Sequence, residues 1–162
     1  MPISGDEYKK IGRAAAGAVS VVAAYDQRTN ETVALTVSSF VTLSFDPPLV
    51  MFAIQHNTDS YPAMVESKAF GVSLLRAEQS DVAQRFARKG PEKTASTRFD
   101  QGAILRVPFI PNALAQIECL TSQVVLSGDH AIVIGLVENA RTFEGRPLIY
   151  FARQYGAFTP FT

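Results

Sequence analysis

The segment from Leu35 to Leu49 carries the residue types best suited to binding a polar ligand. Five of the ten residues from Leu35 to Ser44 are Thr or Ser, and their hydroxyl groups both donate and accept hydrogen bonds. Because these side chains are small, hydroxyls and main-chain amides can approach a flat ligand closely. Asp46-Pro47-Pro48 then ends the strand, since proline has no N–H and forces the preceding residue into an extended conformation. Taken alone, the pattern fits either a ligand-binding segment or an ordinary strand followed by a turn.

A second candidate is Gly128-Asp129-His130, which separates two long apolar runs. We expect this tripeptide at the tip of a hairpin, where side chains face solvent and can meet a ligand. The imidazole of His130 offers a hydrogen bond and, when protonated, a positive charge. The alternative is that Gly-Asp makes the turn and His130 only follows it.

Other kinds of chemistry find little support in the sequence. His56 and His130 are the only two histidines and form no metal-binding pair of helical spacing, so we expect no metal site. Cys119 is the only cysteine and stands in an apolar run, which predicts a buried, unreactive thiol. No G-x-S-x-G, P-loop or dinucleotide-binding glycine motif occurs in a suitable context.

Length and charge limit the remaining classes of protein. The 162 residues, 47% of them apolar, predict one folded domain over 1–162. Lys plus Arg equals Asp plus Glu at 15 each, which argues against nucleic acid or an anionic membrane as a partner. The N-terminus lacks the features of a signal peptide, and no apolar stretch has membrane-spanning length. We therefore expect a cytoplasmic protein with no membrane association.

The elements that must position these residues are mostly strands. β-branched and apolar runs alternate with polar turns, and no strand–helix unit repeats, which favours an antiparallel barrel over a doubly wound sheet. Ser60 or Thr58 is expected to cap a short helix that Pro62 enters. Strands are expected over 19–25, 33–37, 49–55, 70–75, 115–126, 131–143 and 148–152, helices over 6–16, 61–66 and 78–89, and a loop over 92–101.

In sequence order these features resemble the short-chain flavin reductases. In that family a T-x-x-S-F element leads through a V-S-x-D-P-P-like element into an apolar strand, as residues 36–49 do here. The family also carries G-D-H, a β-branched strand with an acidic residue, a turn, P-L-x-Y-F and a tyrosine. The counterparts are residues 128–138 and 147–151 and Tyr155, and residues 70–75, 83–87 and 117–119 match as well. The resemblance covers nearly the whole chain.

The resemblance implies a fold and an activity. The expected fold is mainly β with flanking α-helices, a six-stranded antiparallel Greek-key split β-barrel that forms a homodimer. The expected reaction is the reduction of FMN or FAD by NADH or NADPH, with reduced flavin passing to a separate monooxygenase that hydroxylates an aromatic compound. The alternative is a non-catalytic flavin-binding or flavin-carrier protein on the same barrel. Gly128-Asp129-His130 favours the enzyme, because a carrier does not need that motif.

The resemblance also assigns roles to individual residues. No catalytic acid or base is expected, because the two cofactors supply the hydride chemistry. Arg85 has the alternative role of a solvated helix residue, and Phe86 that of a core residue. Asp59 stands in the expected phosphate-binding segment, where its carboxylate would repel a phosphate unless it points away or contacts a hydroxyl or ribose. The expected flavin contacts are Thr36, Val37, Ser38, Ser39, Thr42 and Ser44 at the ring and ribityl chain, with Asn57, Thr58, Ser60, Arg85, Phe86 and Lys89 nearer the phosphate; the expected nicotinamide-nucleotide contacts are His130 and Tyr155.

Overall fold

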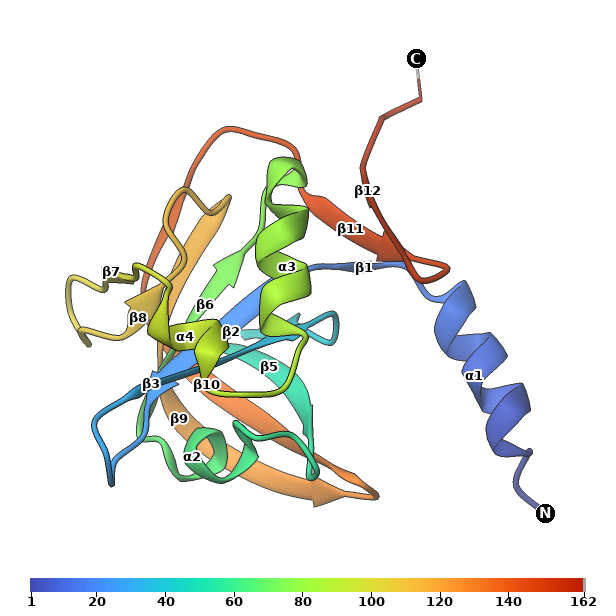
Figure 1. Cartoon of the computed structure of the whole chain (residues 1–162), viewed down its shortest axis with the longest axis horizontal. Coiled ribbons are helices and arrows are strands. Elements are labelled where there is room, and N and C mark those ends of the chain that lie inside the picture. Colours follow the sequence, from blue (N-terminus) through green and yellow to red (C-terminus); the bar gives the residue numbers. More distant parts are fainter. Residues whose placement is uncertain (162) are drawn as a thin grey trace.

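A seven-stranded antiparallel sheet forms the body of the protein (Figure 1). The computed structural model describes residues 1–161. The strand order is β3-β2-β6-β9-β10-β5-β4, and every neighbouring pair is antiparallel. The strands are β2 (Ser20–Tyr25), β3 (Thr32–Val37), β4 (Val41–Phe45), β5 (Pro48–Gln55), β6 (Ala69–Leu74), β9 (Ala115–Ser127) and β10 (His130–Thr142).

The expected mainly β architecture with flanking helices is confirmed. The sheet has seven strands rather than the six expected, and within residues 1–161 the edge strands β3 and β4 are not paired with each other. Two smaller sheets complete the strand set. They are formed by β1 (Gly17–Ala18), β11 (Leu148–Phe151) and β12 (Gln154–Ala157), and by β7 (Asp100–Gln101) with β8 (Pro108–Phe109).

The long hairpin predicted in the C-terminal half is confirmed. His130 pairs with Ser127, so Gly128 and Asp129 form a two-residue turn, and Gly128 has the positive φ of 60° that such turns require. A further strand, β12, was not predicted. Ala152 and Arg153 adopt positive φ values of 49° and 66°, and this reverses the chain directly after β11.

The core lies on both faces of β2, because successive side chains of a strand point to opposite sides. Val22 belongs to one cluster with Phe52 and Phe70, whose rings pack edge to face at 5.3 Å. Val21 belongs to a second cluster with Phe86. Helix α2 (Tyr61–Glu66) covers the first cluster through Met64. Helix α3 (Ser80–Phe86) covers the second through Ala83 and Phe86.

The helices differ from the prediction at their ends. The helix expected over 78–89 is a 3-10 turn, η1 (Ala77–Gln79), followed by α3. The loop expected over 92–101 contains α4 (Glu92–Ala95), directly after Pro91, a residue whose fixed φ suits the start of a helix. The cap of α2 is also different, because Ser60 makes no side-chain capping bond. None of the helices within residues 1–161 has the length and apolar character needed to cross a membrane.

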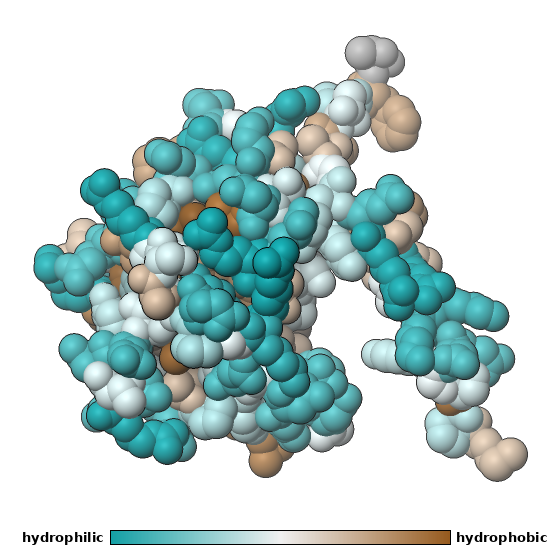
Figure 2. Space-filling view, in the orientation of Figure 1, coloured by the Kyte–Doolittle hydropathy of each residue, from teal (hydrophilic) through white to brown (hydrophobic). Residues whose placement is uncertain are grey.

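Helix α1 (Gly5–Ala14) stands away from the sheet (Figures 1 and 2). It has no buried residue. Its start is fixed locally by a capping box, in which Ser4 Oγ accepts from Glu7 N at 3.3 Å and Glu7 Oε2 accepts from Ser4 N at 3.0 Å. Local capping therefore sets where α1 begins, and its apolar side chains Tyr8 and Ile11 remain exposed.

Candidate functional site

The hydroxyl-rich segment lies where β3 passes into β4. Thr36 and Ser38 line a cavity of about 180 Å³. Tyr155 lines the same cavity, so the fold brings this residue, expected at the nicotinamide nucleotide, to the expected flavin segment. Ligand pockets usually enclose about 300–1,000 Å³, so within one protomer this cavity can hold only part of a flavin. The other lining residues are Val19, Ala87 and Tyr150.

Two of the expected hydroxyl ligands are engaged with the main chain. Thr36 Oγ1 donates to Ala83 O at 2.8 Å, which ties β3 to α3. Ser39 Oγ donates to Ala53 O at 3.2 Å and accepts from Ala53 N at 3.0 Å, which ties the β3–β4 connection to β5. Val37 is buried in the core, so towards a ligand it can offer only its main chain.

The remaining hydroxyls of this segment are available to a ligand. Ser38 and Thr42 are exposed and Ser44 is half-buried. None of the three makes a side-chain hydrogen bond elsewhere in the part of the chain that the structure describes. The segment thus divides into hydroxyls that hold the fold and hydroxyls that face outward.

The expected phosphate segment is held in the same way. Thr58 Oγ1 donates to Gln55 O at 2.9 Å, and the buried Ser60 donates from Oγ to Ala34 O at 3.1 Å. At the start of α2, Tyr61 N donates to Thr58 O at 3.0 Å and Pro62 has no N–H. The first turn of α2 therefore offers few N–H groups to an anion, and exposed Asn57 is the polar side chain that can reach one.

The Asp59 carboxylate is bonded to the main chain of another segment. Its Oδ2 accepts a hydrogen bond of 2.6 Å from Gly90 N, and both residues line a small cavity with Lys93. Burial lowers the pKa of Lys93, while the charges of Asp59 and Glu92 act in the opposite direction. Because the Asp59 carboxylate is engaged by an N–H group and lies beside a lysine, the expected repulsion of a phosphate is reduced.

The α3 residues expected near the phosphate have different environments. Arg85 is exposed, and its Nη1 donates to Thr97 Oγ1 at 3.3 Å. Lys89 is also exposed. Phe86 is 1% exposed and packs against Phe99 at 5.9 Å, so its side chain belongs to the core rather than to a ligand site. Arg85 and Lys89 remain accessible to an anion.

His130 stands at the hairpin tip, as expected. Its Nδ1 lies 2.6 Å from Asp129 Oδ1, and Asp129 Oδ2 accepts from Gln55 Nε2 at 3.4 Å. The hydrogen bond with His130 is the main cause of a lowered pKa for Asp129. The carboxylate orients the imidazole and leaves Nε2 for a ligand.

Figure 1 shows the β9–β10 turn, which carries His130, well apart from β12, which carries Tyr155. One protomer therefore does not bring these two residues together.

Sequence reasoning missed three residues that line the β3–β4 cavity. Tyr150 packs against Tyr155 with ring centroids 5.2 Å apart. The pKa of Tyr155 is raised, first by burial and second by the charge of the neighbouring Tyr150. Tyr150 lies in the P-L-x-Y-F element that carried the resemblance, which was a usable signal. Nothing in the sequence marked Val19 or Ala87, whose place in the cavity depends on the folded chain.

The free hydroxyl of Ser38 and the rings of Tyr150 and Tyr155 border one cavity, an arrangement that suits a flat ligand with a polar edge. A family model described as "Flavin reductase like domain" matches residues 12–159. The chain therefore belongs to the flavin reductase like domain family, and the resemblance to short-chain flavin reductases is confirmed.

Individual relatives agree with this assignment. The chain is 36% identical over 129 residues to an NADH:riboflavin 5'-phosphate oxidoreductase of Streptomyces pristinaespiralis, covering 78% of this chain and 73% of the relative. It is 37% identical over 141 residues to the reductase component of 4-hydroxyphenylacetate 3-monooxygenase of Thermus thermophilus, covering 86% and 87%. Among solved structures, BorF, the flavin reductase component of a bacterial two-component tryptophan halogenase, matches with a TM-score of 0.86 and 26% identity, covering 97% and 99%.

Proposed function

We propose that this chain is an NADH:flavin oxidoreductase that reduces FMN or FAD and supplies the reduced flavin to a separate monooxygenase acting on an aromatic compound. The family match over residues 12–159 carries this proposal. The names of the relatives support its parts, since one is an oxidoreductase for NADH and riboflavin 5'-phosphate and another is the reductase component of an aromatic monooxygenase. The carrier alternative is not favoured, because these relatives are named as oxidoreductases or reductase components.

The residues of this chain act by positioning. A flavin held here would supply the hydride-accepting chemistry for the nicotinamide nucleotide, and the protein would contribute binding, orientation and exclusion of water. Ser38, Thr42 and Ser44 hydrogen-bond to the polar edge of the flat ligand. Tyr150 and Tyr155 cover its apolar part. Holding two rings in contact makes the transfer effectively unimolecular, which accounts for much of the rate without an acid or base.

The proposal includes a homodimer. Phe45 on the edge strand β4 is 98% exposed, and Val41 and Leu43 on the same strand are exposed as well. An unpaired edge with a row of apolar side chains favours association with another surface. The projecting helix α1, with exposed Tyr8 and Ile11, offers a second contact to the partner copy. A second copy would also enlarge the incomplete cavity at the β3–β4 connection.

The remaining assignments belong to the same proposal. The proposed flavin contacts are those expected from the sequence. Val37, Phe86 and the main-chain-bonded hydroxyl residues Thr36, Ser39, Thr58 and Ser60 contribute through the fold rather than through their side chains. We include one domain over 1–162 and closure of the sheet as the family's six-stranded Greek-key split barrel. A cytoplasmic location is included because the reaction consumes a reduced nicotinamide nucleotide.

The test is steady-state oxidation of NADH and of NADPH by the purified chain, with riboflavin, FMN and FAD added in turn. We expect oxidation of NADH only when a flavin is added. A matched control contains the same flavin without protein. Binding of flavin without oxidation of either nucleotide would support the carrier alternative instead.

A further inference from the structure

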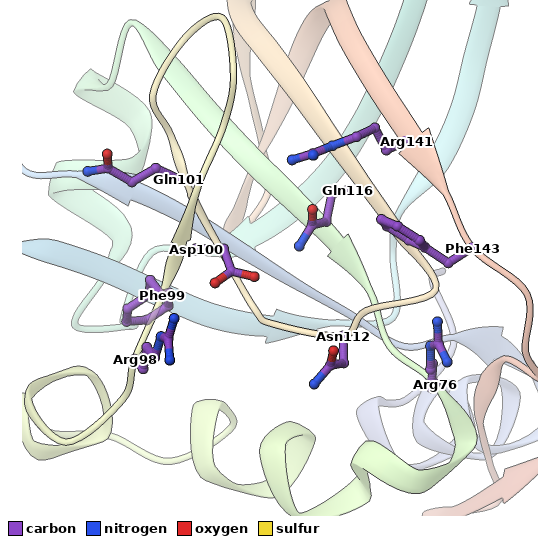
Figure 3. Close-up of a pocket in the computed structure, with 9 residues that line it drawn as sticks. All are labelled: Arg76, Arg98, Phe99, Asp100, Gln101, Asn112, Gln116, Arg141 and Phe143. Atoms are coloured by element: carbon purple, nitrogen blue, oxygen red, sulfur yellow. The ribbon is translucent and has the colours of Figure 1, made fainter.

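A second cavity, of about 580 Å³, lies outside the proposed flavin site (Figure 3). None of the residues expected to bind flavin or nicotinamide nucleotide lines it. Its walls come from the end of β6, the segment entering β7, and the adjoining ends of β9 and β10. Its volume lies within the usual range for a small ligand, about 300–1,000 Å³. The lining residues are Arg76, Arg98, Phe99, Asp100, Gln101, Asn112, Gln116, Arg141 and Phe143.

Three guanidinium groups meet at this cavity. Figure 3 shows Arg76, Arg98 and Arg141 approaching from three sides, with Asp100 and Gln116 between them. Within residues 1–161 none of the three arginines forms a salt bridge, and Asp100 forms none either. Three arginines that line one cavity without salt-bridge partners give it a positive potential, which favours a negatively charged occupant.

Arg76 gives a second, independent indication. Its Nε is buried and has no hydrogen-bond partner in the described part of the chain. A buried donor without a partner is costly, and such groups in folded proteins usually bind a water, an ion or a ligand. The main chain of Arg76 is held firmly, because its N donates to Gln79 Oε1 at 3.0 Å and it forms a bridge to Pro147. The unpartnered Nε therefore belongs to a residue whose main chain is fixed.

The opposite wall is fixed as well. Arg141 on β10 lies directly across from Gln116 on β9 in the antiparallel ladder, so their side chains share one face of the sheet. Gln116 Nε2 donates to Ile110 O at 3.1 Å and is buried. The side-chain carbonyl of Gln116 and the guanidinium group of Arg141 are directed towards the cavity (Figure 3).

We propose that this cavity binds an oxyanion carrying at least two negative charges, in the form of a phosphate-bearing or polycarboxylate small molecule. Among the described lining residues the three arginines outnumber the single carboxylate, Asp100, by two charges, so an occupant with two negative charges matches the lining. Arginine forks match the paired oxygens of phosphate and carboxylate groups.

Calorimetric titration of the full chain with pyrophosphate and, separately, with citrate tests the proposal at low ionic strength. We expect one of the two to bind, with affinity falling as salt is added; pyrophosphate binding indicates a phosphate ligand, and citrate binding a carboxylate ligand. Arg141→Gln should weaken binding about tenfold, the effect of losing one charged hydrogen bond. Lys10→Gln removes the same charge from exposed α1 and should leave the affinity unchanged.

A second variant gives a change of opposite sign. Asp100→Asn removes the one carboxylate among the described residues that line the cavity and should tighten binding several-fold, an effect that misfolding cannot produce. The absence of binding to the wild type, equal affinity in wild type and R141Q, or a D100N affinity no tighter than wild type would each overturn the proposal. Displacement of the bound anion by FMN or NADH would also overturn it, because the cavity would then belong to the flavin site.

Discussion

The Asp59 carboxylate accepts a 2.6 Å hydrogen bond from the main-chain N–H of Gly90. This bond ties the loop before α2 to the turn after α3, the two segments that carry Asn57 and Lys89. Gly90 has a φ of 105°, a conformation that other residues rarely adopt. The Asp59 carboxylate, which was expected to repel a phosphate, therefore connects the two segments that carry the proposed phosphate contacts Asn57 and Lys89.

Asp59→Ala should loosen this connection. We expect the free energy of unfolding to fall by about 1 kcal/mol, since the bond is charged but exposed to solvent. FMN affinity should fall as well, because Asn57 and Lys89 lose their fixed spacing. Urea unfolding and a flavin titration measure the two effects. Glu144→Ala, which removes an exposed carboxylate from a turn, is the control; equal behaviour of both variants would contradict the prediction.

The serines at positions 38 and 39 should respond differently to substitution. Ser38→Leu should weaken FMN binding up to about tenfold through one lost hydrogen bond and through steric filling of the cavity, with little change in stability. Ser39→Ala should lower the free energy of unfolding by about 1–2 kcal/mol, because both bonds to Ala53 are lost. Flavin titration and urea unfolding of each variant separate the roles. An unchanged FMN affinity in a folded Ser38→Leu chain would remove Ser38 from the site.

Sequence reasoning predicted the elements whose signals are local. The β9–β10 hairpin combines long β-branched runs with Gly128-Asp129, and both the strands and the turn follow from these residues. Helix α4 has four residues, too few for an apolar period to be visible. Strand β12 depends on the positive φ values of Ala152 and Arg153, which nothing in their residue types requires.

The sequence indicated which residue types the candidate site contains, but it could not show the group to which each hydroxyl is hydrogen-bonded. A hydroxyl group that binds flavin and one that bonds to the main chain look alike in a sequence. Thr36, Ser39 and Ser60 prove to be bonded to Ala83, Ala53 and Ala34, contacts separated by 47, 14 and 26 residues. The arginine cavity could not be predicted for the same reason, because Arg76, Arg98 and Arg141 meet only when β6 and β10 lie in one sheet.

Glu118 should make stability depend on pH. Burial opposes its ionisation, but hydrogen bonds from Asn139 and from the N–H groups of residues 103–105 outweigh this, so its pKa is lowered. A lowered folded-state pKa stabilises the protein above the unfolded value, 4.5, and this contribution is lost as the pH falls through the folded value.

Glu118→Gln tests this dependence. At neutral pH the variant should lose about 1–3 kcal/mol, because one amide oxygen cannot satisfy all the N–H groups. Its stability should then fall less than that of the wild type when the pH is lowered below the unfolded value. Urea unfolding across acidic pH measures both curves, and parallel curves would show that another group causes the acid sensitivity.

The homodimer can be tested at β4. Sedimentation of the wild type at micromolar concentration should give twice the chain mass of 17.6 kDa. Phe45→Glu places a charge at the 98% exposed ring position, so it should shift the protein towards the monomer without destabilising the fold. Glu138→Gln, an exposed change on β10, is a control. A wild type that sediments at 17.6 kDa would exclude the dimer.

His130 provides the sharpest test of the nicotinamide-nucleotide site. Asp129 Oδ1 lies 2.6 Å from Nδ1, so the ring is already oriented and Nε2 can contact the nucleotide. Losing a neutral hydrogen bond costs about 0.5–1.5 kcal/mol and a charged one about 1.5–3 kcal/mol. His130→Ala should therefore raise the KM for NADH several-fold or more. FMN affinity should stay nearly constant, because Ser38 and Thr42 belong to another part of the sheet.

Asp129→Asn separates orientation from contact. This variant keeps the imidazole but weakens the bond that orients it, so the KM for NADH should rise less than in His130→Ala. Steady-state kinetics at several NADH concentrations, with a flavin titration for each variant, give the comparison. Native NADH kinetics in His130→Ala would show that the histidine only follows the turn. Loss of flavin affinity with unchanged NADH kinetics would show instead that the hairpin tip contacts the flavin, most directly across a dimer interface, since β12 and this turn lie apart within one protomer (Figure 1).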